Sequence, residues 1–239
     1  MVRVDGRTAE EHRKTSITPN YLSFAEGSAL IEMGQTRVLC AATIEERVPI
    51  FLRAQGRGWI TAEYGMLPRS TISRTPRDED GRRGGRAAEI QRLIGRSLRA
   101  VTDMAAIGER TIVLDCDVLQ ADAGTRTAAI TGAYVALYQA TLHLVRQQII
   151  PSIPLYCAVA AISVGIVDSE PLLDLCYEED ARAEVDFNVV MTNEGEFVEL
   201  QGTAEGKPFS HETMNSLVIL AQTGINALFR IQQSAIDSL

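Results

Sequence analysis

The segment from Thr111 to about Gln148 constrains the fold more than any other part of the chain. Apolar and polar residues alternate from Thr111 to Leu119, which is the pattern of a β-strand with two different faces. The turn Gly124-Thr-Arg-Thr127 follows, and apolar residues then recur at helical spacing until the prolines at 151 and 154. This order predicts a strand that leads through a glycine turn into a long helix ending near Gln148.

Strand and helix patterns also occur on both sides of this segment. They predict a hairpin over 28–43 around Gly34, a helix over 89–104, strands over 156–167 and 171–177, a hairpin over 183–202, and a helix from His211 to Gln232 with Ser210 as its N-cap. Strands followed by helices, twice over, predict an α+β fold. We expect one compact domain over residues 1–239, built from two related halves of about 1–150 and 151–239.

The composition is that of an ordinary globular protein, with 46% apolar and 23% charged residues in a chain of 239. No run approaches the roughly 18 consecutive apolar residues of a membrane helix, and the first residues are charged. We therefore expect a cytoplasmic protein with no membrane partner. The four cysteines, Cys40, Cys116, Cys157 and Cys176, form no Cys-x-x-Cys pair, so we expect reduced and mostly buried thiols.

Positive charge is concentrated in one part of this acidic chain. The net charge of -8 taken alone disfavours a polyanionic partner. However, 21 of the 23 basic residues are arginine, and nine of these lie between Arg69 and Arg99. The planar guanidinium binds phosphate oxygens in pairs, so this window favours anion recognition. For the tip between Arg77 and Arg83, a solvated charged loop is an equally good interpretation.

The helix predicted from residue 89 has two different faces. Apolar residues from Ile90 to Val101 recur on one side, while Arg92, Arg96 and Arg99 lie on another. The pattern predicts a helix with one buried side and one cationic side.

Two glycine turns are candidate anion sites. At Gly124-Thr-Arg-Thr127, the free amides of a helix N-terminus, the close approach that glycine permits and the charge of Arg126 would together suit a phosphate. The alternative is that Thr125 or Thr127 only caps the helix and that Arg126 is a surface residue. Gly84-Gly85-Arg86 is a second cationic turn, for which a simple turn is the alternative.

An acidic cluster precedes and enters the strand predicted after residue 181. Its even positions are polar, so Asp186 and Asn188 project from one face, and Asp180 lies in the preceding turn. Paired carboxylates are the expected ligands of a hard divalent cation. The alternative is an edge strand with one solvated face.

Several longer motifs resemble bacterial RNase PH across nearly the whole chain. They are the opening Asp5-Gly-Arg7, the runs 56–68 and 89–100, Asp115 to Asp122 with Gly124-Thr-Arg-Thr127, and 198–206. The resemblance implies two βαβα halves, in protomers that form a homohexamer as a trimer of dimers. It also implies a phosphorolytic 3′→5′ exoribonuclease that trims the 3′ ends of tRNA precursors with inorganic phosphate, releases nucleoside diphosphates, and can run in reverse as a nucleotidyltransferase.

The resemblance also assigns roles to individual residues. The phosphate site would be Arg86, Gly124, Thr125 and Arg126, the catalytic residues Arg126, Asp180 and Asp186, and the ligands of Mg²⁺ or Mn²⁺ the two aspartates. The RNA-contacting arginines would be Arg69, Arg74 and Arg77, to which we add the helical face of Arg92, Arg96 and Arg99.

Two positions depart from the family pattern. Ala123 stands where a second glycine is usual, and we expect its methyl group to shift phosphate affinity slightly. Cys176 stands where aspartate is frequent, which leaves Asp174 and Asp180 as the neighbouring acids and questions a three-carboxylate metal site. Two other functions stay open: an inactive ring subunit that threads RNA, and a metal-dependent hydrolytic exonuclease.

Overall fold

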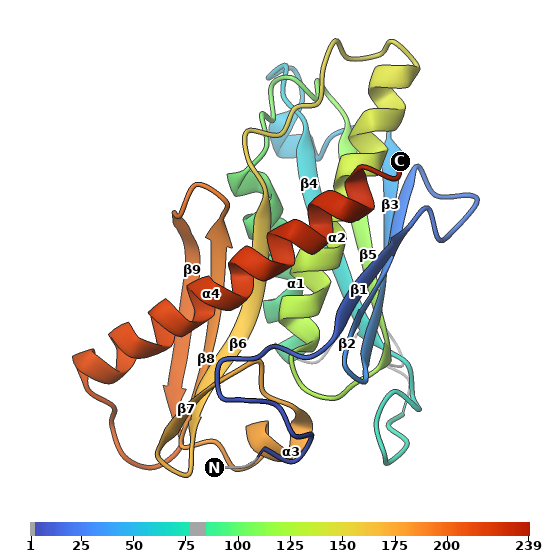
Figure 1. The fold of residues 1–239 in the computed structure, drawn as a ribbon. Helices are drawn as coiled ribbons and strands as arrows, with labels where there is room; N and C mark the ends of the chain where they lie inside the picture. The colour runs from blue at the N-terminus through green and yellow to red at the C-terminus, as the bar shows by residue number, and fades with distance from the viewer. Residues whose placement is uncertain (1–2, 77–84) are drawn as a thin grey trace.

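Two β-sheets and three long helices form the fold of the computed structural model, which describes residues 3–76 and 85–239 (Figure 1). The first sheet has the order β1 (Thr15–Pro19), β2 (Gly27–Met33), β3 (Thr36–Glu45), β5 (Thr111–Gln120), β4 (Trp59–Met66). The second has the order β7 (Glu170–Leu173), β6 (Val159–Val167), β8 (Val185–Thr192), β9 (Phe197–Ala204). The helices are α1 (Gly85–Ala100), α2 (Thr125–Arg146), α3 (Tyr177–Asp180) and α4 (His211–Ile236), with a 3₁₀ turn, η1, at Ile50–Leu52. The predicted α+β class is confirmed.

The predicted strand, turn and long helix are β5 and α2. Helix α2 packs against β2 and β3 of the first sheet and against β6 of the second, so both sheets cover it (Figure 1). At Gly132 an added Cβ would lie 2.8 Å from the Ile31 side chain, so only glycine allows this close approach to β2. A helix buried on most sides is apolar on most sides. This accounts for α2 being the one described helix that by length and hydropathy alone could cross a membrane.

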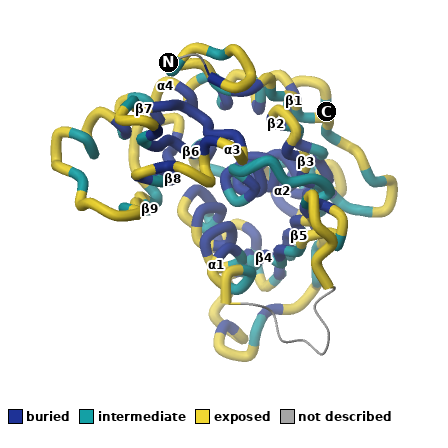
Figure 2. The backbone as a smooth tube through the Cα atoms, turned by 90° about the horizontal axis from the view of Figure 1, so that it is seen from below, coloured by how far each residue is buried: buried dark blue, intermediate teal, exposed yellow. Residues whose placement is uncertain are grey.

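The two halves share one hydrophobic core. Buried side chains of β3, β5, α2, β6, β8 and α4 belong to a single contiguous cluster, whereas the side chains of β9 are partly buried or exposed (Figure 2). The change from the first sheet to the second falls between the end of α2 at Arg146 and the start of β6 at Val159.

Several predicted boundaries were wrong. Helix α1 begins at Gly85 and ends at Ala100, and α4 continues to Ile236. The strand predicted over 171–177 ends at Leu173, because Asp174 adopts a left-handed conformation with φ 54° and a helical turn begins at Tyr177. The Cys176 amide donates a hydrogen bond of 3.1 Å to the Glu179 carboxylate, which stabilises that turn. Strands β1 and β4 were not predicted.

Candidate phosphate and metal site

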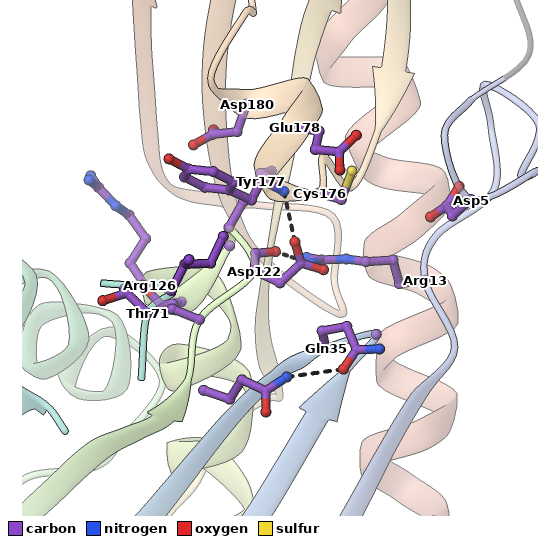
Figure 3. A pocket seen from close by; sticks show the side chains of 18 of the residues that line it. Asp5, Arg13, Gln35, Thr71, Asp122, Arg126, Cys176, Tyr177, Glu178 and Asp180 are labelled. Atoms are coloured by element: carbon purple, nitrogen blue, oxygen red, sulfur yellow. Dashed lines mark hydrogen bonds and ion pairs between the residues drawn. The ribbon is translucent and has the colours of Figure 1, made fainter. Parts of the chain in front are cut away.

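A pocket of about 1280 Å³ opens where the start of α2 meets the second sheet and α3 (Figure 3). The N-terminal segment, the loop after β4, the start of α1 and the loop before α2 line it from the first half, and β6, α3 and β8 line it from the second. In Figure 3, Asp180 and Tyr177 from α3 and Arg126 from α2 extend to the same side of this pocket. Both halves are therefore needed to build it.

The loop before α2 leaves the amides at the helix start without a side-chain cap. Ala123 and Gly124 are both left-handed, with φ values of 56° and 62°, and among the described residues no side chain accepts a capping hydrogen bond at Gly124. The Thr125 hydroxyl lies 2.7 Å from the Tyr64 hydroxyl, and Thr127 donates to the Gly124 carbonyl oxygen at 2.9 Å. The interpretation of these threonines as helix caps is therefore wrong, and the amides are available for an anion.

Arg126 is held at the start of α2 by a polar row on the second sheet. Its Nη1 donates a hydrogen bond of 2.6 Å to Gln201 Oε1 and lies 3.5 Å from a Glu89 oxygen. Gln201 is directly opposite Asn188, and Asn188 is directly opposite Ser163, so the three share one face of β9, β8 and β6. This row places uncharged polar groups beside the arginine.

Ser163 has a buried hydroxyl that is unsatisfied. Its Oγ has no hydrogen-bond partner within residues 3–76 and 85–239, and the residue is 3% exposed. An added Cβ at Gly124 would lie 3.8 Å from this oxygen, and both residues line the pocket. A buried hydroxyl without a partner is destabilising, so its position beside the loop indicates a ligand that supplies the missing bond.

The two candidate acids meet from different elements. Asp180 is at the end of α3, and Asp186 lies on β8, which is an interior strand between β6 and β9. The edge-strand interpretation is therefore wrong. Burial, followed by the negative charge of Asp180, raises the pKa of Asp186 despite the opposing charges of Arg126 and Arg86. Burial also raises the pKa of Asp180, against the charges of Arg86, Arg126 and Arg13.

The carboxylate pair suits a hard cation. Among the described residues, no group of three or more His, Cys, Asp or Glu side chains converges on one point. Mg²⁺ is commonly bound by only one or two carboxylates together with substrate phosphates, so a pair is sufficient. The negative charge of Asp180 disfavours the ionised form of Asp186, and a divalent cation held by the two carboxylates would offset this repulsion.

Asp174 is not available as a third metal ligand. Its side chain is fully buried and accepts hydrogen bonds of 2.7 Å and 3.0 Å from the Arg13 guanidinium. Burial raises the pKa of this carboxyl, but Arg13 outweighs burial and lowers it below the usual value. Cys176 lines the pocket, and burial raises the pKa of its thiol.

Both halves of the chain match known family models. Residues 11–143 match domain 1 of the 3′ exoribonuclease family, RNase PH, and residues 157–224 match domain 2. The chain belongs to the RNase PH family. It is 57% identical over 234 residues to ribonuclease PH of Dehalococcoides mccartyi, which covers 98% of this chain and 97% of that protein. It is 56% identical over 240 residues to ribonuclease PH of Moorella thermoacetica, covering 100% of this chain and 96% of that protein.

Solved structures of more distant RNase PH-fold proteins share the fold. The crystal structure of rice (Oryza sativa) Rrp46 has a TM-score of 0.79 at 20% identity and covers 98% of this chain and 100% of that one. The Archaeoglobus fulgidus exosome with RNA bound to the active site has a TM-score of 0.81 at 21% identity and covers 95% of this chain and 91% of the other. The predicted resemblance to RNase PH is thus confirmed for sequence and for fold.

The structure brings together Arg86, Gly124, Thr125, Arg126, Asp180 and Asp186, all of which line the pocket. None of the predicted RNA-binding arginines that the structure describes lines the pocket. Arg69, Arg74, Arg92 and Arg96 are exposed and outside the pocket lining, and Arg77 lies outside the described residues. Arg99 stacks 4.3 Å from the centre of the Trp59 ring and donates to the Ile60 carbonyl oxygen, which gives it a packing role between α1 and β4.

Three residues of the site were missed from the sequence. Ser163 was the only polar residue of an apolar strand, and Gln201 lay on the polar face of a strand, so each had a local signal. Arg13 had none, because its partner Asp174 is 161 positions away.

Proposed function

We propose that this chain is a phosphorolytic 3′→5′ exoribonuclease that acts on the 3′ ends of tRNA precursors. The observation that carries the proposal is the pairing, in one pocket, of a cationic uncapped helix start at Gly124 to Arg126 with the carboxylates of Asp180 and Asp186. The first group suits the attacking phosphate. The second suits a cation at the scissile phosphodiester.

The reaction exchanges one phosphorus–oxygen bond for another. An oxygen of inorganic phosphate bonds to the phosphorus of the last phosphodiester, and the bond to the 3′ oxygen of the preceding nucleotide breaks. The products are a nucleoside diphosphate and an RNA shorter by one nucleotide, whose 3′ oxygen takes up a proton. The reverse reaction adds a nucleotide.

Charge repulsion between the two anions is the main barrier, so positioning and electrostatics dominate catalysis. Arg126, Arg86 and the amides of the Gly124 loop would hold the phosphate, and the unsatisfied Ser163 hydroxyl offers one more donor. Gln201 fixes the direction of Arg126. None of these groups acts as a nucleophile.

Asp180 and Asp186 are the residues that would hold Mg²⁺ or Mn²⁺. Such a cation would supply positive charge at the phosphodiester oxygens. When Asp180 is not holding a cation, its raised pKa would let it donate the proton that the leaving 3′ oxygen takes up, a role that water would fill equally well.

The products of RNA degradation test the proposal. A 3′-extended RNA is incubated with the protein and Mg²⁺, with and without inorganic phosphate. We expect nucleoside diphosphates only when phosphate is present. Nucleoside monophosphates in phosphate-free buffer would support the hydrolytic alternative, and no product under either condition would support the inactive RNA-threading subunit.

The RNA path would begin at the loop after β4. Thr71, Ile72 and Ser73 line the pocket between Arg69 and Arg74, so these two arginines flank a segment of the pocket wall. Replacing Arg69 and Arg74 by alanine should weaken RNA binding and reduce its salt dependence. Unchanged binding of the double variant would place the RNA elsewhere.

The homohexamer, as a trimer of dimers, is a further part of the proposal. Large apolar side chains such as Phe24, Ile50 and Tyr156 are more than 60% exposed, and such residues often mark interfaces. Mass measurement in solution should give six times the chain mass, and a monomer would contradict this part.

A further inference from the structure

We propose that Arg13 is a positioning residue that holds the phosphate loop of the first half in register with the acid-bearing helix α3 of the second half. The inference rests on the proposed function, because it concerns the geometry of the phosphate site. Arg13 lies near the end of the N-terminal segment, two residues before β1 begins at Thr15, and lines the pocket together with Asp122 (Figure 3).

Arg13 is anchored to the second half through Asp174. The carboxylate of Asp174 accepts hydrogen bonds from the Arg13 amide at 2.8 Å, from Nε at 3.0 Å and from Nη2 at 2.7 Å. Both side chains are buried, at 3% and 0% exposure. A buried, multiply bonded ion pair has one favourable geometry, so Asp174 fixes the direction of the guanidinium.

The remaining guanidinium nitrogen holds the phosphate loop. Arg13 Nη1 donates to the Asp122 carbonyl oxygen and lies 3.6 Å from the Asp122 carboxylate. At Gly124, an added Cβ would lie 2.9 Å from Arg13 Nη2, so the guanidinium packs directly against the loop. Arg13 therefore contacts the loop immediately before the amides that would bind phosphate.

Asp122 closes the link to α3. Its Oδ1 accepts a hydrogen bond of 2.9 Å from the amide of Tyr177, the first residue of the helix that ends at Asp180. Asp174, Arg13, Asp122 and Tyr177 thus form a continuous chain of bonds between the two halves. Moving Arg13 would shift the loop and the acid-bearing helix relative to each other.

Only arginine can make these contacts together. Its planar fork places donors at Asp174 and at Asp122 simultaneously, whereas a lysine ammonium is a single point at the end of a flexible stem. Arg13→Lys keeps the positive charge near Asp174 but loses the simultaneous contact with the loop.

Arg3 supplies a matched control in the same buried cluster. It pairs with Glu179 at 2.6 Å and donates to the backbone of Leu173 and Asp174. Within residues 3–76 and 85–239, its hydrogen bonds reach the N-terminal segment or the second half, and none reaches the phosphate loop. Arg3→Lys therefore disturbs an equally buried arginine that contacts α3 through Glu179 but not the phosphate loop, so it shows whether the contact with the loop is the one that matters.

The test compares three variants of the full-length protein: Arg13→Lys, Arg3→Lys and Asp174→Asn. Thermal unfolding gives the stability of each, and steady-state phosphorolysis gives KM for phosphate and kcat separately. Arg13→Lys should raise the KM for phosphate roughly tenfold or more, because a small misplacement of a binding group has effects of that size. Asp174→Asn should raise the KM for phosphate less, since the side-chain oxygen of asparagine can still accept a hydrogen bond from Arg13. Arg3→Lys should lower the melting temperature similarly but leave this KM within about twofold.

Each outcome separates the inference from the proposed function. If the wild-type protein shows no phosphorolysis, the proposed function itself is refuted. A wild-type KM for phosphate in folded Arg13→Lys, or an equal rise in Arg3→Lys, would overturn the role of Arg13 alone. If Arg13→Lys fails to fold, Asp174→Asn decides, and an unchanged KM for phosphate in that variant overturns the inference.

Discussion

The Arg126 guanidinium at the start of α2 donates a hydrogen bond of 2.6 Å to Gln201 on the edge strand β9. This bond joins a helix of the first half to the sheet of the second. It holds the arginine in one orientation beside the uncapped loop at Gly124, and Glu89 completes the triangle by accepting a bond of 2.8 Å from Gln201.

Arg126→Ala should remove phosphate use. A preorganised donor to a reacting anion contributes roughly a hundredfold to a thousandfold in rate, so kcat/KM for phosphate should fall by that amount. RNA binding, measured by fluorescence anisotropy, should persist. Arg146→Ala is the control, because Arg146 is exposed at the other end of the same helix. Loss of RNA binding with normal phosphate use would refute the role given to Arg126.

Ser163→Ala should weaken phosphate binding without loss of stability. One hydrogen bond to a charged group contributes about 1.5–3 kcal/mol, so phosphate affinity should fall about tenfold or more. Removing a buried hydroxyl that lacks a partner should leave the melting temperature unchanged or slightly higher. Ser97→Ala is the control, because the buried Ser97 hydroxyl donates to the Leu93 carbonyl oxygen. Phosphate titration by calorimetry measures the effect, and unchanged affinity would exclude Ser163 from the site.

Replacing Asp186 by asparagine should stabilise the folded protein at neutral pH, whereas replacing Asp174 by asparagine should destabilise it. The pKa of Asp186 is raised in the folded protein, so its ionised form disfavours folding at neutral pH, and this effect disappears as the pH falls through the raised pKa. The pKa of Asp174 is lowered, so its ionised form favours folding above the ordinary value of about 3.9, and this stability is lost below it.

In metal-free protein at pH 7, Asp186→Asn should therefore raise the melting temperature by a few degrees, and Asp174→Asn should lower it. Added Mg²⁺ should stabilise the wild type and stabilise Asp186→Asn much less. Equal stabilisation of both proteins by Mg²⁺ would remove Asp186 from the metal site.

Ala123→Gly should stabilise the protein. Ala123 has φ 56°, a conformation that costs a residue with a Cβ about 1–2 kcal/mol, while glycine loses about 0.4–1 kcal/mol more backbone entropy on folding. The difference should raise the free energy of unfolding by up to about 1.5 kcal/mol. Denaturant unfolding measures this free energy. A destabilised variant would show that packing of the alanine methyl group stabilises the protein by more than the backbone strain costs.

Local patterns predicted the elements that carry the site more reliably than the contacts within it. The alternation before Gly124 and the helical spacing after it were enough for β5 and α2, because each pattern is set by neighbours in sequence. The turn at Tyr177 was predicted as the end of a strand, since mostly apolar residues precede it and the arginines that bond to Asp174 after β7 are distant in sequence.

The phosphate and acid residues were recognised through long motifs, whereas the residues that orient them were not. Arg13 and Asp174 meet only because the N-terminal segment crosses to the second half. The sequence also did not predict the backbone strain at Ala123, since this strain comes from its positive φ angle and not from a contact of its methyl group.

The fate of labelled phosphate distinguishes phosphorolysis from hydrolysis at this site. The protein is incubated with a 3′-extended RNA, Mg²⁺ and ³²P-labelled inorganic phosphate, and the nucleotides released are separated. Phosphorolysis at this site requires that the label appear in the terminal phosphate of nucleoside diphosphates, and that Arg126→Ala abolish it. Release of unlabelled nucleoside monophosphates at the same rate with or without phosphate would contradict the account.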